Sequence, residues 1–232
     1  MDFSDESNAN VASLIQMIAN PAWGDITGDG VPEYLISGVS SLYLASLASR
    51  KWLDYQQGIG AWDGVTGEIL EGWPRQLEDL QLLSAPAIAD ISGDGKADVI
   101  AISAGFLAHA WESNGEKIEG WPKHTGGWIL GSPAVGDITG DGYLDVVVTT
   151  REGKLFAWTT KGSADQKTEW ASIHHDAQNT GNYEHPLPVQ AGPPVVEAPA
   201  ESGCCSEKGN SEAALLLFPL VMWSRLRRRR EN

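Results

Sequence analysis

The sequence predicts an all-β protein made of β-propeller-type blades, each with four antiparallel strands, of which about three are visible. The first observation is an acidic turn that occurs three times, at Asp25–Gly30, Asp90–Gly95 and Asp137–Gly142. The second is a set of tryptophans that recur at a nearly constant interval. Repeats of this length, rich in short strands, are typical of propeller blades. Because closed propellers have at least four blades, three blades predict an incomplete ring.

Three landmarks agree on a repeat of about 48 residues. A small residue followed by tryptophan occurs at Trp62, Trp111 and Trp158, which are 49 and 47 residues apart. The stretch "EGWP" occurs twice, with its tryptophans 48 residues apart at 73 and 121, and "EW" at 169–170 is its expected relic. The first unit is longer by 16 residues, since 37 residues separate its acidic turn from its tryptophan, against 21 in the other two. We therefore expect an insertion within residues 40–57.

Each unit shows strand patterns on both sides of the acidic turn. In the third unit "SPAVGDI" precedes the turn and the β-branched "YLDVVVTT" follows it, with "KLFAWTT" and a segment ending at residue 170 as further strands. The blades are expected at 15–74, 75–122 and 123–185, after a disordered N-terminus at 1–14. A β-solenoid is the alternative, although its coils are usually shorter.

The acidic turns carry a ligand pattern for a hard cation. Acids recur at positions 1, 5 and 9, a hydroxyl stands at position 3, and glycines stand at positions 4 and 6. Calcium binds six to eight oxygens, and position 7 would add a backbone carbonyl. The candidate ligands are Asp25, Thr27, Asp29, Val31 and Glu33; Asp90, Ser92, Asp94, Lys96 and Asp98; and Asp137, Thr139, Asp141, Tyr143 and Asp145.

The acid spacing differs from that of an EF-hand, which needs an acid at position 12 and flanking helices. Asp and Gly also favour tight turns between strands without any metal, so a purely structural turn is the alternative. Hydroxyls at position 3 in place of carboxylates predict weak sites that suit the millimolar calcium outside cells.

The stretches "GDITGDGYLDVVV" and "ADISGDGKADVIAI" resemble the FG-GAP/VCBS repeats of integrin-type β-propellers. The resemblance covers residues 15–185. It implies that calcium binds between the first two strands of each blade, and it assigns this role to the acids at positions 1, 5 and 9.

The stretch "AWDGVTGEILEGW" is similar to the tryptophan-docking motif of quinoprotein propellers, in which the tryptophan packs against the next blade. We accordingly expect core packing for Trp62, Trp73, Trp111, Trp121 and Trp158. Carbohydrate stacking by Trp128 or Trp52 is the alternative use of a tryptophan.

The segment at 174–185, "HHDAQNTGNYEH", resembles the closing signature of such repeat domains and is expected to cap the last blade. His174, His175 and Asp176 are candidate metal ligands or catalytic groups in principle. No nucleophile with a matching base accompanies them, so no catalytic residue and no enzymatic activity are predicted.

Charge excludes one class of partner. The net charge is −15, and the last eight residues, "RLRRRREN", hold five of the arginines. A strongly acidic body repels phosphates, so nucleic-acid binding is not expected.

The C-terminal part has a different character from the repeats. Residues 186–203 form a linker rich in Pro, Ala, Val and Glu, and residues 204–232 contain Cys204, Cys205, the apolar run Ala213–Trp223 and the arginine cluster. Eleven apolar residues are short for a bilayer span. The order of these features resembles MYXO-CTERM sorting tags, which implies a short hydrophobic helix, membrane contact before processing, and a cysteine as the anchoring site.

Together these features predict a calcium-stabilised propeller region of an exported or surface-anchored bacterial protein that binds a protein or carbohydrate ligand. The N-terminus lacks a signal peptide, so we expect the sequence to be the C-terminal part of a longer protein. The alternatives are an accessory propeller of a secreted hydrolase or quinoprotein-like enzyme, and an intracellular scaffold.

Overall fold

The computed structural model describes residues 14–15, 19–40, 57–79, 81 and 83–188, which form thirteen β-strands and no helix. The all-β prediction is confirmed. Two compact units divide the chain, Met1–Val195 and Val196–Asn232, and every described residue belongs to the first. Most of the predicted linker and the whole C-terminal segment, with Cys204 and Cys205, lie outside the described residues, as does Trp52. In the described part of the chain, no helix has the length and apolarity required to cross a membrane.

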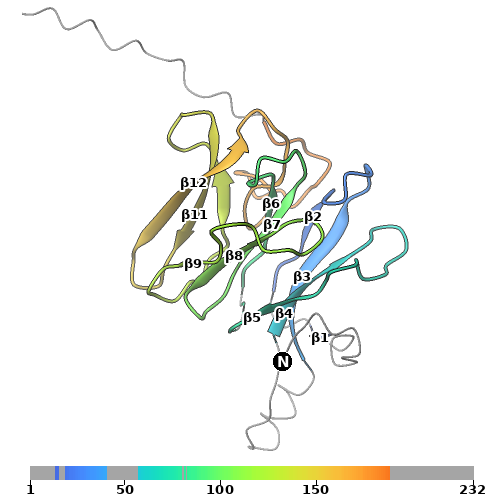
Figure 1. Ribbon diagram of the computed structural model, residues 1–232, viewed down its shortest axis with the longest axis horizontal. Helices are drawn as coiled ribbons and strands as arrows, with labels where there is room; N and C mark the ends of the chain where they lie inside the picture. The colour runs from blue at the N-terminus through green and yellow to red at the C-terminus, as the bar shows by residue number, and fades with distance from the viewer. Residues whose placement is uncertain (1–13, 16–18, 41–56, 80, 82, 189–232) are drawn as a thin grey trace, which may run out of the picture. The chain divides into compact units, whose positions relative to one another are not determined.

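Three antiparallel sheets follow one another along the chain and lie side by side (Figure 1). The first contains β1 (Leu14–Ile15), β2 (Ala22–Gly24), β3 (Glu33–Ser40), β4 (Gln57–Trp62) and β5 (Arg75–Leu77). The second contains β6 (Ala87–Ala89), β7 (Asp98–Ile102), β8 (Leu107–Trp111), β9 (Lys123–His124) and β13 (Thr168–Trp170). The third contains β10 (Ala134–Gly136), β11 (Tyr143–Thr149) and β12 (Leu155–Ser163). In the first two sheets, four consecutive strands form the meander that the repeat predicts.

The insertion in the first unit lies where the spacing predicted it. β3 and β4 pair in register, with Val39 opposite Gln57, so the extra residues fall between these two strands. The corresponding hairpins of the other sheets are short, with Ile102 opposite Ala108 and Thr149 opposite Leu155.

The sheets stack with a constant polarity. We call the side of each sheet that bears Trp62, Trp111 or Trp158 its front face, and the opposite side its back face. Small and aliphatic residues on the back face of one sheet pack against the front face of the next. The first interface joins Ala22, Leu35 and Ala61 to Ile88, Val99 and Trp111. The second joins Ala87, Ile100 and Ala110 to Val135, Val146 and Trp158. Each buried aliphatic side chain contributes about 1.5–3 kcal/mol.

The expected tryptophan packing is found to different degrees. Trp73 and Trp111 are buried, and their rings meet edge to face with centroids 6.1 Å apart. Trp121 and Trp158 form the corresponding pair one interface later, at 5.8 Å, and are half-buried. Trp62, on the front face of the first sheet, is also half-buried.

In the described part of the chain, the third sheet has three strands, one fewer than the four expected for each blade. In the second unit Asn114 and Gly115 form a tight turn after β8, with Gly115 at φ 78°. The third unit has "TTKGSADQK" in this region, so β12 continues to Ser163. The chain then returns as β13, which pairs antiparallel with β6 of the second sheet, with Trp170 opposite Ile88.

β13 and the residue after it contact the strand that precedes the acidic loop in each sheet, namely β2, β6 and β10. β13 contacts β2 as well as β6, and the N–H of Val135 in β10 donates to the carbonyl of Ala171, just after β13. Trp170 is part of the apolar core shared by the first two sheets. Gly24 permits this approach, because a Cβ at that position would lie 2.9 Å from Cβ of Glu169.

Candidate metal-binding loops and an adjacent groove

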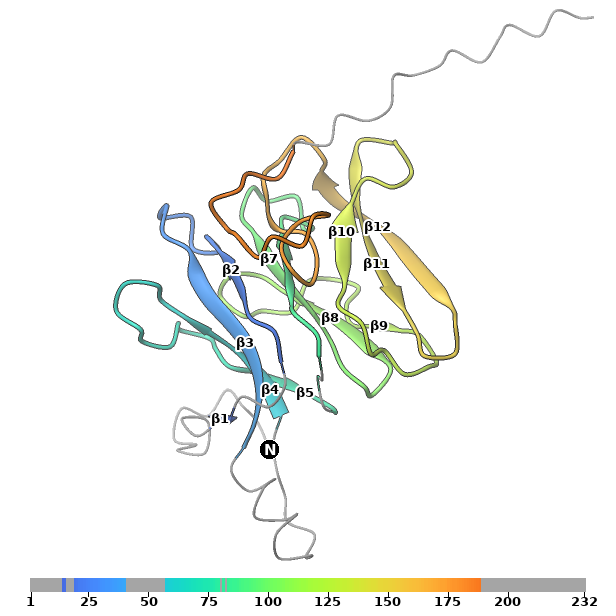
Figure 2. The same ribbon diagram turned by 180° about the vertical axis from the view of Figure 1, so that it is seen from behind.

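The three acidic loops occupy the same place in their sheets. Each loop connects two neighbouring strands of its sheet. The loops join β2 to β3, β6 to β7 and β10 to β11, and all three lie at the same end of the sheets (Figure 2). The two glycines of each loop have φ between 75° and 90°, a conformation that other residues rarely adopt. The sequence pattern therefore predicted three equivalent turns correctly.

The acid at position 1 closes each loop from within. Its two carboxylate oxygens accept hydrogen bonds from the backbone N–H groups at positions 4 and 6. The distances are 2.7 and 2.9 Å for Asp25, 2.6 and 2.8 Å for Asp90, and 2.6 and 2.9 Å for Asp137. This arrangement holds the carboxylate at the centre of a ring of backbone donors.

The acid at position 9 lies in the first residues of the strand after the loop and is buried: Glu33 and Asp98 begin β3 and β7, and Asp145 is the third residue of β11. Glu33 and Asp98 are 0% exposed and Asp145 is 1% exposed. One oxygen of each accepts the N–H groups of positions 2 and 3, at 2.8 and 3.2 Å for Glu33, 2.9 and 2.8 Å for Asp98, and 3.1 and 3.3 Å for Asp145.

The remaining predicted ligands lie nearer the surface. The acids at position 5, Asp29, Asp94 and Asp141, are exposed, and each accepts the N–H of position 7 at 2.8 to 2.9 Å. The hydroxyls of Thr27 and Thr139 donate to the acid at position 9, and that of Ser92 donates to Asp90. At position 7, the residues donate their backbone N–H groups to the acid at position 5. They are Val31, Lys96 and Tyr143.

The second loop differs from the other two in its electrostatics. Oδ1 of Asp98 is buried and has no hydrogen-bond partner. Burial raises the pKa of Asp98 to about 7, and the negative charges of Glu112 and Asp90 add to this effect. Burial also raises the pKa of Glu112, and the negative charges of Asp94, Asp90 and Glu116 add to this effect.

The other loops satisfy the equivalent oxygen. In the third loop, Oγ1 of Thr159 donates to Oδ1 of Asp145 at 2.7 Å. In the first loop, Oγ1 of Thr27 donates to Oε1 of Glu33 at 3.3 Å, and burial still raises the pKa of Glu33. Thr159 and Glu112 both directly follow the tryptophan of their unit, at Trp158 and Trp111. Between the second and third units, the residue after the repeated tryptophan therefore makes the difference, whereas in the first unit the loop's own Thr27 satisfies the acid.

The loops offer the hard oxygens that calcium requires. The unpaired Oδ1 of Asp98 is a buried carboxyl oxygen, and a nearby cation would favour the ionised form of this group. Within the described ranges, no three His, Cys, Asp or Glu side chains form a group arranged to hold a metal ion. The calcium ligation remains a prediction.

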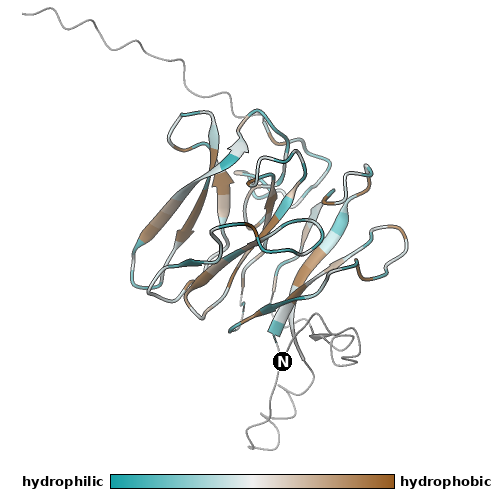
Figure 3. Ribbon diagram, viewed as in Figure 1, coloured by the Kyte–Doolittle hydropathy of each residue, from teal (hydrophilic) through white to brown (hydrophobic). Residues whose placement is uncertain are grey.

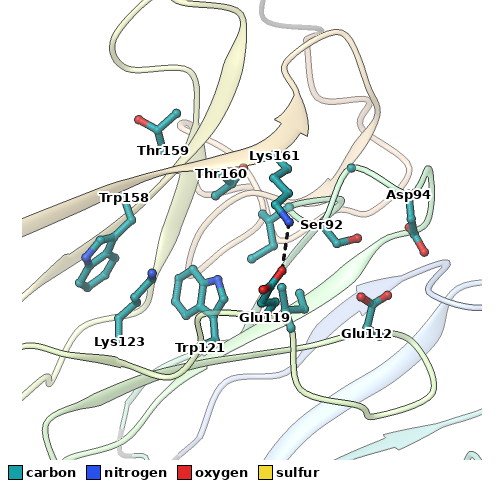
Figure 4. Close-up of a pocket in the computed structure, with 13 residues that line it drawn as sticks. Ser92, Asp94, Glu112, Glu119, Trp121, Lys123, Trp158, Thr159, Thr160 and Lys161 are labelled. Carbon is teal, nitrogen blue, oxygen red and sulfur yellow. Dashed lines mark hydrogen bonds and ion pairs between the residues drawn. The ribbon is translucent and has the colours of Figure 1, made fainter.

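A groove opens between the second and third sheets beside the second loop (Figure 4). Its volume is about 490 Å³. Trp121 and Trp158 lie at one end, with Lys123 5.5 Å above the Trp121 ring. Asp94 and Glu112 lie at the other end, and the ion pair between Lys161 and Glu119 crosses the middle at 3.5 Å.

The equivalent position between the first and second sheets is closed. There Nε1 of Trp73 donates to the carbonyl of Ser113 at 2.8 Å, and the guanidinium of Arg75 contacts Asn114. The groove exists because β12 runs straight past the point at which β8 turns. The sequence periodicity did not predict it, since the periodicity treats the two interfaces as equal.

The closing segment packs at the first strands of the sheets and does not cap the outer edge of the last blade. His175 is 2% exposed and meets Trp170 edge to face at 4.9 Å. Asp176 is also buried, and a hydrogen bond from the Thr180 hydroxyl lowers its pKa to about 2. His174 is exposed. These contacts give His175 and Asp176 a structural role.

The fold and loops define a class of protein, a propeller-type repeat with acidic loops between the first and second strands of each sheet. Residues 90–148 match the model of the FG-GAP-like repeat family. This match runs from the second acidic loop to the end of β11 and supports, for that segment, the resemblance seen in the sequence.

The comparison with curated proteins gave no match. Among solved structures, the crystal structure of the V. cholerae biofilm matrix protein Bap1 is similar to this chain, with a TM-score of 0.46 and 20% identity. The similarity covers 69% of this chain and 26% of that one, so the chain spans about a quarter of the length of Bap1.

Proposed function

We propose that this chain is a calcium-stabilised propeller-type repeat region of an exported or cell-surface bacterial protein, and that it binds a protein or carbohydrate ligand without catalysing a reaction. The observation that supports the proposal is the equivalence of the three acidic loops. All three hold a carboxylate inside a ring of backbone donors and bury a second carboxylate at the start of the next strand.

Calcium would act on the loops through its charge. Each loop concentrates three acids within nine residues, and burial raises the pKa of Asp98 and Glu33. A bound cation favours the ionised form of the nearby acids and removes their mutual repulsion. In the second loop, the residues that would hold it are Asp90, Asp94 and Asp98, with the Ser92 hydroxyl and the Lys96 carbonyl.

Thermal unfolding with and without calcium tests this part of the proposal. Metal-stripped protein should gain stability as calcium rises into the millimolar range, by about 1–3 kcal/mol at tenfold to hundredfold excess over the dissociation constant. Magnesium at the same concentration should stabilise less, because it demands octahedral geometry. Identical melting curves in chelator and in calcium would contradict the proposal.

A pair of matched variants separates ligation from net charge. Asp94→Asn removes a loop charge but keeps the oxygen that accepts the Lys96 N–H. Asp165→Asn removes one charge from an exposed acid outside the loops. We expect Asp94→Asn to weaken calcium binding, measured by isothermal titration calorimetry, and Asp165→Asn to leave it within error of the parent.

Surface display is the second part of the proposal. The basis is the acidic repeat region together with the predicted sorting segment at 204–232. Fractionation of cells that produce the full-length protein, followed by mass spectrometry of its C-terminus, tests this. The expected result is surface protein from which the arginine cluster has been removed, and intact protein confined to the cytoplasm would contradict it.

The groove of Figure 4 is the place where we propose that a ligand binds. Indole rings, hydroxyls and charges of both signs line it, a mixture typical of sites for polar ligands. Glycan and matrix-protein arrays should give at least one ligand whose binding Thr160→Ala or Glu119→Gln weakens. Ligands that bind both variants as tightly as the parent would place the site elsewhere.

A further inference from the structure

The stacked sheets leave one apolar face uncovered at each end of the described region. The front face of the first sheet and the back face of the third have no sheet packed against them in the described part of the chain. The hydropathy colouring shows hydrophobic stretches on β11 and β12 of the third sheet (Figure 3). Exposed apolar faces of this kind mark interaction surfaces.

The front face of the first sheet carries a row of three aromatic side chains. Trp23, Tyr34 and Trp62 lie opposite one another on adjacent strands, and their ring centroids are 4.9 and 6.2 Å apart. Trp23 is 36% exposed. The Trp62 ring lies flat over Gly60, where a Cβ would come within 2.3 Å of it. The absence of a side chain at Gly60 thus keeps this face flat.

The molecule itself shows what covers such a face. By position in the repeat, Trp23, Tyr34 and Trp62 correspond to Ile88, Val99 and Trp111 of the second sheet and to Val135, Val146 and Trp158 of the third. Both of these rows are packed against the back face of the preceding sheet. The natural cover for the first row is therefore the back face of another sheet of this kind.

The back face of the third sheet has the composition of the back faces that serve as covers within the molecule. Ala134, Val147 and Ala157 lie side by side across its three strands, as Ala87, Ile100 and Ala110 do in the second sheet. In the third sheet these residues are half-buried or exposed. Leu155, on the same face, is 63% exposed.

We propose that two copies of this chain associate through these faces, with the front face of the first sheet in one copy packed on the back face of the third sheet in the other. The contact repeats the two front-to-back interfaces already present within the chain. Such a contact is head-to-tail, so each copy uses both of its end faces. The described parts of two copies bring six sheets together, a number within the range of four to eight blades of closed propellers, so a closed pair covers all four end faces.

Sedimentation of the full chain, with reductant present to keep the cysteines from linking copies, tests the proposal. Over about two orders of magnitude in concentration, the parent protein should pass from monomer to dimer. Trp23→Glu on the front face and Leu155→Glu on the back face should each raise the dimer dissociation constant by at least about tenfold. Ile138→Glu is the control, since Ile138 is 60% exposed but lies in the third acidic loop.

Mixing the two face variants identifies the polarity of the contact. Trp23→Glu keeps its back face and Leu155→Glu keeps its front face, so an equimolar mixture should regain dimers that neither variant forms alone. A symmetric front-to-front contact would leave Leu155→Glu dimeric and would overturn the proposal. Monomeric parent protein at every concentration would overturn it as well. Circular dichroism of each variant verifies folding, and Leu155→Glu, at a largely exposed position, keeps the test valid if Trp23→Glu does not fold.

Discussion

Oγ1 of Thr159 donates a 2.7 Å hydrogen bond to Oδ1 of the buried Asp145, whereas Oδ1 of Asp98 at the equivalent position has no partner. Both buried acids accept the backbone N–H groups of positions 2 and 3 through their other oxygen, so the difference at Oδ1 comes from the residue that follows the repeated tryptophan. Thr159 offers a donor, and the corresponding residue in the second unit is Glu112, which brings a second negative charge. We therefore expect a bound cation or proton to stabilise the second loop more than the third, because it removes repulsion between Asp98 and Glu112.

Stability of the metal-free protein should depend on pH through Asp98. Burial raises the pKa of Asp98 from 3.8 to about 7, so the native state retains a proton that the unfolded chain releases near pH 4. The free energy of unfolding consequently falls as pH rises from about 4 to about 7, and the loss is complete above that range. The expected loss is on the order of a few kcal/mol. Burial raises the pKa of Glu33 and Glu112 too, which acts in the same direction.

Urea unfolding in chelator between about pH 5 and 8 measures this dependence. Asp98→Asn should flatten it, because an amide does not titrate in this window, while Asp141→Asn makes the same change at an exposed loop acid and should leave the slope intact. Equal slopes for the parent and Asp98→Asn would refute the assignment. The lowered pKa of Asp176 contributes only between about pH 2 and 4, where stability is lost as the pH falls.

Thr159→Val should destabilise the third loop. The substitution keeps the shape and the strand preference but removes the donor to the buried Oδ1 of Asp145. An unsatisfied buried acceptor costs about 1–3 kcal/mol, measured as the change in free energy of unfolding. Thr149→Val makes the same change at an exposed position of β11 and serves as the control. Equal effects at the two positions would show that the hydrogen bond does not matter.

Gly24→Ala should disturb the packing of β13. The new Cβ would lie 2.9 Å from Cβ of Glu169 and from Cδ1 and Cγ2 of Ile88, and the Glu169 Cβ can move only with the backbone of β13. Overpacking of this kind costs about 1–3 kcal/mol. Gly131→Ala is the matched control, because its Cβ would find nothing nearer than Oγ1 of Thr149 at 3.7 Å. Thermal unfolding that ranks the two variants equally would contradict the tight contact.

Trp73→Phe should loosen the interface between the first and second sheets. Trp73 is 6% exposed, and its indole N–H donates to the carbonyl of Ser113 across that interface. Loss of the hydrogen bond and of part of the ring should cost about 1–3 kcal/mol in chemical denaturation. Trp128→Phe changes a tryptophan that is 42% exposed, and its effect should stay within about 0.5 kcal/mol.

The repeats, the position of the insertion and the three acidic turns could all be predicted from the order of the residues. These features depend on residues close together in the chain, such as the two loop glycines at φ of 75° to 90° and the acid three to five residues before the N–H groups that it binds. The small back-face residues of β2 and β6 likewise follow from the repeat, because the first and second sheets each accept the front face of the next sheet.

The pairing of β13, the position of the groove and the buried acid without a hydrogen-bond partner became visible in the folded structure alone. Each of these depends on residues far apart in the chain. β13 joins β6, about 80 residues earlier, and Asp98 and Asp145 differ through the residues at 112 and 159, 14 positions further on. A repeat pattern treats equivalent positions as equal, whereas packing and hydrogen bonding respond to the one side chain that differs.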